Sequence, residues 1–324
     1  MKFERKKIVL EIITPFFISS GEEYLDIDYV YDENKIKIID KDRFNKRVFQ
    51  DKKLYEKLLN IADDTNKLKS FFKNNAKEFL YDVSLSKKVS KLLANNKSIN
   101  IKKFIRDKYT QTPIIPGSTI KGVIRTSLAN YYYHNQFKNK LQNENSESKF
   151  LNAIFRNYEN DAKRDVLKAL YISDLKPIRY ETKVIRPFYK INIEDEPNDL
   201  DVLEVLVNGK FEGEIVINKV LKNYSSIDLS FNVIEKSLEK FFSKILSYEK
   251  NRINNPDYKF PEYKKYLIKV GLHSGAGSKT IEGKRKIKVK LKNEKKPKIL
   301  DYQLSTWFDE NKNALGWAKL EFKD

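Results

Sequence analysis

The spacing of hydrophobic residues changes several times along the chain, and each change predicts a new element. Residues Lys7–Thr14 are largely apolar and favour a buried first strand, which ends at Pro15 and a Ser-Ser-Gly turn. Apolar residues then recur at helical spacing through most of Asp40–Leu93. Further helices are predicted from Ser118 to about His134, over about Ser148–Tyr158 and over Asp228–Asn251.

Strands are predicted between these helices, so the two kinds of element alternate twice. They are expected over Val166–Leu175, Phe211–Ile217 and Gly316–Phe322, with an extended segment at Ile99–Tyr109. The polar segment Lys138–Lys149 is expected to be a mobile insertion. The pattern predicts two small units, each a sheet with helices on one face, that divide near residues 160–176.

The net charge of the chain indicates what kind of partner it binds. The chain has 64 Lys and Arg against 45 Asp and Glu, a net charge of +19, which points to nucleic acid or an anionic membrane surface. It has no cysteine and only two histidines, which excludes disulfides, Cys-ligated zinc, thiol catalysis and a multi-histidine metal centre. No apolar run reaches the ~20 residues that span a bilayer. Glu11 and Pro15 also interrupt the apolar start, which argues against a signal peptide. We therefore expect a cytoplasmic protein without a cofactor.

The excess of positive charge is concentrated near the C-terminus. Residues 261–300 hold 13 Lys or Arg against 3 Asp or Glu. Within them, Lys286–Lys292 alternates lysine with Ile, Val or Leu, so a strand would place four lysines on one face about 6.6 Å apart. Such a row could follow the phosphates of a single strand, or it could protect a sheet edge from aggregation.

A second basic motif begins the helix predicted after Pro116. Ser118 or Thr119 would cap this helix, and Lys121 and Arg125 would lie together beside its apolar stripe. Cations in a first helical turn oppose the helix dipole, at a cost of ~0.3–1 kcal/mol. A phosphate bound at the helix N-terminus would remove this cost. An ordinary capped helix with solvated basic residues is the alternative.

The segment Gly271–Thr280 (GLHSGAGSKT) is the third candidate. Its three glycines permit positive φ angles and close backbone approach, and successive amides can form an anion nest. The spacing matches neither a Walker A loop nor a GxGxxG motif. The segment is therefore predicted either to contact a phosphate chain through its backbone or to serve as a flexible connector.

Four segments in this order resemble the RAMP superfamily of CRISPR-associated RNA-binding proteins. They are TPFFISSGEEY at Thr14–Tyr24, IPGSTIKGVIRT at Ile115–Thr126, GLHSGAGSKT at Gly271–Thr280 and ALGWAKLEF at Ala314–Phe322. The IPGS element is shared by many members of the superfamily. The His-Ser-Gly loop with the terminal LGW strand is most similar to the fifth-subunit family of type III-A Csm effector complexes.

The resemblance implies an α+β fold of two ferredoxin-like (RRM-like) domains, residues 1–165 and 166–324. The helical insertion at about residues 40–99 departs from the shared pattern. It also implies a β-hairpin thumb, for which the candidate is Ile178–Val205 with an acidic stretch at its tip. The implied role is to bind guide RNA and cap the row of Csm backbone subunits at the guide 3′ end. The implied partners are the guide RNA, the guide–target duplex, neighbouring Csm subunits and external nucleases that trim the 3′ end.

The residues favour binding over catalysis. Metal-free RNA cleavage commonly needs a general acid and a general base, which are often two histidines. His134 and His273 are the only histidines in the chain. The acidic residues near Glu22 and Asp28 fit a solvated loop better than a two-metal site. A metal-independent endoribonuclease that processes guide precursors is the alternative, and a protein that binds a membrane surface or scaffold electrostatically is a third.

The expected RNA-binding residues come from the turn, the helix motif, the thumb base and the Gly-rich loop. They are Ser19, Ser20, Gly21, Gly117, Ser118, Thr119, Lys121, Arg125, Arg179, Lys183, Arg186, His273, Ser274, Gly275, Gly277, Ser278, Lys279, Thr280, Lys284 and Arg285. Replacing Lys121, Arg125 or Lys279 with alanine is expected to weaken binding to all RNA sequences and to flatten its salt dependence.

Overall fold

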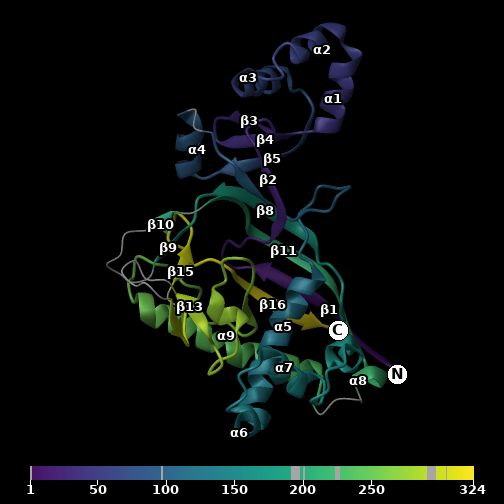
Figure 1. Ribbon diagram of the computed structural model, residues 1–324, viewed down its shortest axis with the longest axis vertical. Coiled ribbons are helices and arrows are strands. Elements are labelled where there is room, and N and C mark those ends of the chain that lie inside the picture. The colour runs from purple at the N-terminus through teal and green to yellow at the C-terminus, as the bar shows by residue number, and fades with distance from the viewer. Residues whose placement is uncertain are drawn as a thin grey trace.

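The computed structural model describes residues 2–95, 98–190, 198–199, 201–222, 227–289, 297–303 and 305–324. A mixed sheet of 11 strands runs through most of its length (Figure 1). Its strands are β1 (Phe3–Ile12), β2 (Ser19–Tyr24), β3 (Tyr29–Asp32), β4 (Lys35–Ile39), β5 (Phe79–Leu85), β6 (Ile101–Phe104), β7 (Leu170–Ile172), β8 (Lys176–Ile185), β11 (Val202–Asn218), β12 (Leu267–Lys269) and β16 (Trp317–Lys323). Along the main path the order is β12, β16, β1, β11, β8, β5, β4 and β3, with β2, β6 and β7 on branches.

Two small sheets and a set of helices complete the described fold. The small sheets contain β9 (Phe188–Lys190), β10 (Asn198–Asp199) and β15 (Thr306–Phe308), and β13 (Ile287–Val289) with β14 (Lys298–Leu300). The α-helices are α1 (Lys41–Gln50), α2 (Lys52–Leu59), α3 (Thr65–Asn75), α4 (Lys87–Ala94), α5 (Gly117–Tyr132), α6 (Lys138–Leu141), α7 (Glu147–Phe155), α8 (Lys219–Lys222) and α9 (Phe231–Ile253). A π-helical turn η1 (Tyr133–Phe137) follows α5, and 3₁₀ turns lie at η2 (Ala162–Arg164), η3 (Val166–Ala169) and η4 (Ala276–Lys279).

Strands from both halves of the chain meet at the centre of the sheet. β1 pairs antiparallel with β11 on one side and with β16 on the other. Ile8 and Leu10 of β1 are fully buried and share a core with residues of α5 and α9, which pack against each other. The helices predicted from Ser118 and from Asp228 are therefore confirmed as α5 and α9. The predicted first and last strands are confirmed as β1 and β16, and the bounds of all four shift by a few residues. The two chain ends lie near each other as a result (Figure 1).

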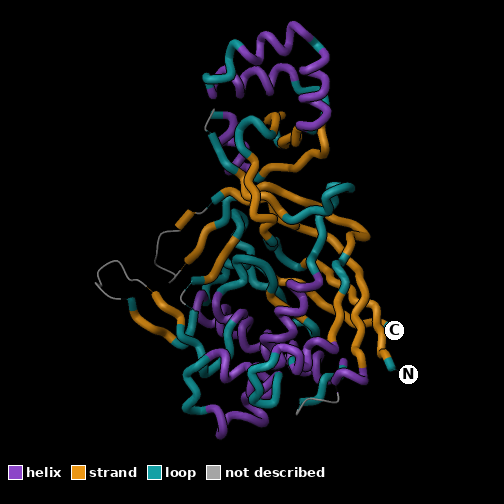
Figure 2. The backbone as a smooth tube through the Cα atoms, turned by 45° about the vertical axis from the view of Figure 1, so that its right-hand side comes forward, coloured by secondary structure: helices purple, strands orange, loops and turns teal. Residues whose placement is uncertain are grey.

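The predicted helical insertion forms a lobe at one end of the molecule. Figures 1 and 2 show α1, α2 and α3 stacked beyond β3, β4 and β5. Phe44, Val48 and Phe71 form a small core of this lobe, separate from the main core. The helices were predicted, but β5 was not. Its short apolar run lies between segments with helical spacing, so the sequence pattern does not separate it from them. β5 joins the lobe to the main sheet by parallel pairing with β8.

Two predicted segments are corrected by the structure. Val166–Leu175 is not one strand, because η3 occupies its first four residues and only Leu170–Ile172 forms β7. Lys138–Lys149 is not a structureless insertion, because it contains α6 and the start of α7. Leu141 is buried in the main core, and this anchors a segment whose composition is otherwise polar.

The mixed α+β class is confirmed, whereas the two ferredoxin-like domains and the thumb stay predictions. One sheet joins residues 1–165 to residues 166–324. The predicted thumb begins in β8, whose Ile185 pairs with Leu203 of β11. Residues 191–197 and 200 of its acidic stretch lie outside the described residues, as do residues 290–292 of the lysine-alternating segment. In the part of the chain that is described, no helix is long and apolar enough to cross a membrane.

Candidate nucleic-acid interface

Three segments that stand out in the sequence meet around one hollow of about 400 Å³. The start of β2 contributes Ser19, with Ile18 just before it. One face of α5 and the Gly-rich loop after β12 contribute most of the rest. The lining residues are Ile18, Ser19, Thr119, Gly122, Val123, Thr126, Lys269, Val270, Gly271, Leu272, Ser274, Ser278 and Lys279. None of these described residues has a carboxylate, so a polyanion can approach without local repulsion.

The face of α5 that lines the hollow carries small and hydroxyl-bearing residues. Thr119 and Val123 are four positions apart, as are Gly122 and Thr126, so the four residues share one side of the helix. A Cβ placed on Gly122 would meet no atom within 4 Å. The absence of a side chain there keeps the hollow open instead of relieving a clash.

Lys121 and Arg125 lie outside this face and are engaged within the protein. The Lys121 ammonium donates to the carbonyl of Leu170 at 2.8 Å, and partial burial lowers the Lys121 pKa. Arg125 pairs with Asp165 at 3.1 Å and stacks over the Phe155 ring. Neither residue lines the hollow, and both make packing contacts within the protein.

A carboxylate of the protein itself already lies at the N-terminus of α5. The helix begins at Gly117 after Pro116, and neither Ser118 nor Thr119 caps it, which corrects the prediction. Asp174 accepts a hydrogen bond from the Gly117 amide at 2.9 Å and so provides the negative charge that the helix dipole favours. Gly117 is required by close packing, because a Cβ there would lie 2.2 Å from the carbonyl oxygen of Ile172.

The Gly-rich loop is held in place by its own hydrogen bonds. Gly275 has a φ of +81°, and its Cβ would lie 2.3 Å from the Gln303 side chain. Gln303 accepts from the Gly277 amide at 2.8 Å, so this part of the predicted anion nest is occupied. The hydroxyls of Ser274, Ser278 and Thr280 donate to carbonyls of the same loop. The loop is therefore a built wall and not a flexible connector.

A buried ion pair is connected to this loop through Gln303, and the sequence pattern did not predict it. Lys269 and Glu249 form a salt bridge with both side chains fully buried. Glu249 also accepts from Gln303 at 2.7 Å, which links the pair to the Gly277 amide. The available signal was Glu249 itself, a carboxylate within the apolar stripe of α9.

His273 and Lys279 differ in what they can offer a ligand. His273 packs 4.6 Å from the Trp307 ring, and burial lowers its pKa to about 4, so it is neutral at neutral pH. Lys279 lines the hollow and is exposed, with its ammonium donating to the Leu272 carbonyl at 2.9 Å. Of the two, only Lys279 lines the hollow.

The remaining basic candidates are spread over other surfaces. Lys284 donates to the carbonyls of Gln142 and Glu144, and Arg285 donates to the carbonyl of Gly277. Arg179 and Lys183 lie on β8, and Arg186 follows it. None of these five lines the hollow.

The Ser19–Gly21 segment, predicted as a turn, is the start of β2 and reaches the hollow only through its first residue. Ser19 lines the hollow and accepts from the Gly21 amide at 3.0 Å. Ser20 instead donates to the carbonyl of Lys103 at 3.2 Å. Gly21 has a φ of +85°, which suits glycine at the register irregularity of β2 between Ser19 and Glu23.

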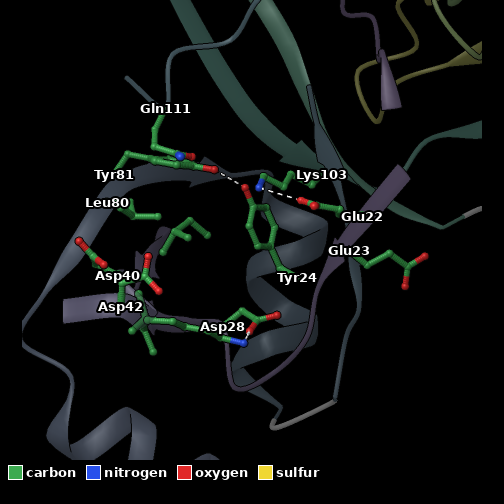
Figure 3. A pocket seen from close by; sticks show the side chains of 13 residues that line it. Glu22, Glu23, Tyr24, Asp28, Asp40, Asp42, Leu80, Tyr81, Lys103 and Gln111 are labelled. Atoms are coloured by element: carbon green, nitrogen blue, oxygen red, sulfur yellow. Dashed lines mark hydrogen bonds and ion pairs between the residues drawn. The ribbon is translucent and has the colours of Figure 1, made fainter. Parts of the chain in front are cut away.

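The acidic residues of the first segment surround a different hollow, in the lobe. Figure 3 shows Glu22, Glu23, Asp28, Asp40 and Asp42 around Tyr24 and Tyr81. Several are paired with cations: Glu22 lies 3.0 Å from Lys103, and Asp28 pairs with Lys41. Among the described residues, no group of three or more His, Asp or Glu side chains could hold a metal ion.

Comparison with known proteins defines the class of protein to which this chain belongs. The family model described as the RAMP superfamily matches residues 9–284. The chain therefore belongs to the RAMP superfamily.

The relatives define the family more narrowly. A protein of Methanocaldococcus jannaschii described as CRISPR system Cms protein Csm5 is 30% identical over 302 residues, covering 82% of this chain and 67% of the relative. A Csm5 of Streptococcus thermophilus is 28% identical over 303 residues, covering 85% and 79%. Within the superfamily, the chain is thus a member of the Csm5 family. A chain in a cryo-electron-microscopy structure of a type III-A Csm–crRNA–target RNA complex shares the fold, with a TM-score of 0.69, 17% identity and coverage of 98% of this chain and 100% of that one.

Proposed function

We propose that this chain binds guide RNA as a subunit of a type III-A CRISPR effector complex. The observation that carries the proposal is the meeting of the three motifs at one hollow without a carboxylate among its described lining residues. In this proposal it caps the row of Csm backbone subunits at the guide 3′ end and supports trimming of that end by external nucleases. Membership in the Csm5 family supports this proposal.

The hollow suits recognition of the sugar–phosphate backbone. Its polar groups are the hydroxyls of Ser19, Thr119 and Thr126, the Gly-rich loop and the Lys279 ammonium. Such groups bind phosphate and ribose without reading base edges. Binding in the hollow is therefore expected to tolerate any guide sequence, as an antiviral system requires.

We further propose that the subunit is not itself a nuclease. His134 lines a hollow between α5 and α9, whereas His273 packs beside Trp307, so the two do not form an acid–base pair in one site. Both Csm5 relatives are described as complex proteins and not as nucleases. The competing function is metal-independent cleavage of guide precursors.

The rest of the expected architecture belongs to the same proposal. Two ferredoxin-like units would form the body, and a thumb at Ile178–Val205 would meet the guide–target duplex. Arg179, Lys183 and Arg186 on and after β8 would contact RNA at the base of that thumb.

A salt-titrated binding assay tests the proposal and its competitor together. Labelled single-stranded RNA, double-stranded RNA and single-stranded DNA are titrated with the chain, alone and assembled with the other Csm subunits, and the same gels are scored for cleavage. Tight binding to single-stranded RNA that Lys279→Ala weakens supports the proposal, with Lys236→Ala on α9 as the matched control. Cleavage at a fixed position without divalent metal, lost in His273→Ala, would establish the endonuclease instead.

A further inference from the structure

A second, smaller hollow lies between α5 and α9, away from the Gly-rich loop hollow. Its volume is about 220 Å³, room for several waters at the roughly 30 Å³ that each occupies in the liquid. It is lined by Asn130, Tyr131, His134, Asn135, Ser237, Lys240 and Lys244. None of these residues lines the larger hollow.

Two polar side chains that line this second hollow, Asn130 and His134, have polar atoms without a hydrogen bond in the described chain. Asn130 is only 5% exposed, and its Oδ1 accepts from the Glu282 amide at 2.9 Å, which fixes the orientation of the side-chain amide. Nδ2 of Asn130 therefore remains as a donor, and within the described chain it has no partner. Nε2 of His134 is buried without a hydrogen bond in the described chain and lies 3.6 Å from a carboxylate oxygen of Glu282.

The charged groups around the second hollow are mostly cationic. Lys240 and Lys244 are four residues apart on α9, so both ammonium groups lie on the same side of the helix and repel each other. Lys244 is balanced by Glu282 at 2.8 Å, and the same carboxylate lies 3.6 Å from His134. Lys240 makes no ion pair within the described residues and lies 5.9 Å from the centre of the Tyr131 ring.

The backbone at the second hollow is irregular. α5 passes directly into the π-helical turn η1, which carries His134 and Asn135. The Asn135 amide donates to the Tyr131 carbonyl at 2.6 Å, which steadies the turn. π-helical turns are rare and are frequently found at functional sites.

We propose that this second hollow binds one phosphoryl group, either inorganic phosphate or a phosphomonoester. Lys240 supplies the uncompensated charge, and Nδ2 of Asn130 and the His134 ring supply further polar contacts. Lys244 shares its charge between the ligand and Glu282. A phosphate oxygen gives the unpartnered donors the acceptors that the protein does not provide.

Histidine NMR tests this proposal, because the chain has only two histidines. The chain is labelled with ¹³C-histidine, and the two ring signals are assigned from His134→Gln and His273→Gln. Potassium phosphate and adenosine monophosphate are then titrated separately at constant ionic strength. The His134 signal should shift to saturation while the His273 signal stays, and the separate titrations distinguish free phosphate from a phosphomonoester.

Bound phosphate should also raise the pKa of His134, which burial together with Lys138, Lys240 and Lys244 lowers and Glu282 partly restores. Lys240→Ala and Asn130→Ala should each weaken phosphate binding at least tenfold. Lys236→Ala, on α9 like Lys240, should change phosphate affinity less than twofold. Guide RNA binding by Lys240→Ala should be unchanged, which separates this site from the proposed function. No saturable shift of His134, equal shifts of both histidines, or equal weakening by Lys236→Ala would overturn the proposal.

Discussion

Gly122 offers a test in which stability and RNA binding move in opposite directions. A glycine inside a helix is about 1 kcal/mol less favourable than alanine. An added Cβ at this position meets no atom within 4 Å, so no clash offsets the gain. Gly122→Ala should therefore raise the free energy of unfolding by about 1 kcal/mol. Gly122→Leu should keep most of this gain, because its longer side chain extends into the open hollow.

The same leucine should weaken RNA binding, because it fills space that the proposed backbone path needs. Unfolding is followed by circular dichroism in urea, and binding is measured with single-stranded RNA at fixed salt. We expect Gly122→Leu to lose at least tenfold in RNA affinity and Gly122→Ala to lose less. A Gly122→Leu chain that is as stable as expected and binds RNA like the unmodified chain would refute the placement of RNA in this hollow.

Three further substitutions test the surrounding network. Lys269→Met leaves Glu249 buried and unpaired and should lower the free energy of unfolding by about 3–5 kcal/mol in urea titrations, whereas Lys269→Met combined with Glu249→Leu should recover most of it. Arg125→Ala should cost about 1 kcal/mol through its contact with Asp165 and leave RNA affinity within twofold; a larger effect on RNA than on stability would contradict the packing role. His273 is kept neutral by burial, so below its ordinary pKa of 6.5 the unfolded chain binds more protons than the folded one. Stability should therefore fall by at most about 3 kcal/mol between pH 6.5 and pH 4, and His273→Gln should remove that part of the pH dependence.

Local patterns predicted several elements, among them α5 and α9, but not the partners that their side chains contact. The apolar stripes of α5 and α9 and the largely apolar run at Lys7–Thr14 were enough to place α5, α9 and β1. Lys121 and Arg125 were assigned to an anion site because the sequence places them together beside the apolar stripe. Their partners, the Leu170 carbonyl and Asp165, lie 40 or more residues away in the chain, and a local pattern cannot show them.

The Gly-rich loop shows the same limit for hydrogen bonding. Its glycines predicted close backbone approach, and Gly275 does approach another group, the side chain of Gln303. The sequence could not show that this group belongs to the protein and not to a phosphate. In the same way, Asp174 fills the helix N-terminus that a phosphate was expected to fill. Groups from the chain itself thus occupy two of the predicted anion positions, and the hollow beside them remains open.

The net charge of the chain therefore overstates the electrostatic part of binding in this hollow. Its lining includes two cations, Lys269 and Lys279, and Lys269 is buried against Glu249. Only Lys279 of this pair can neutralise a phosphate, so the hollow should release about one counterion. For single strands, each neutralised phosphate contributes about 0.7 to the slope of log K against log salt. Lys279→Ala should lower the magnitude of that slope by about 0.7, and any steeper salt dependence that persists must come from basic residues outside the hollow. A decrease well beyond 0.7 would mean that Lys279 organises further cations around the RNA, contrary to the contacts described here.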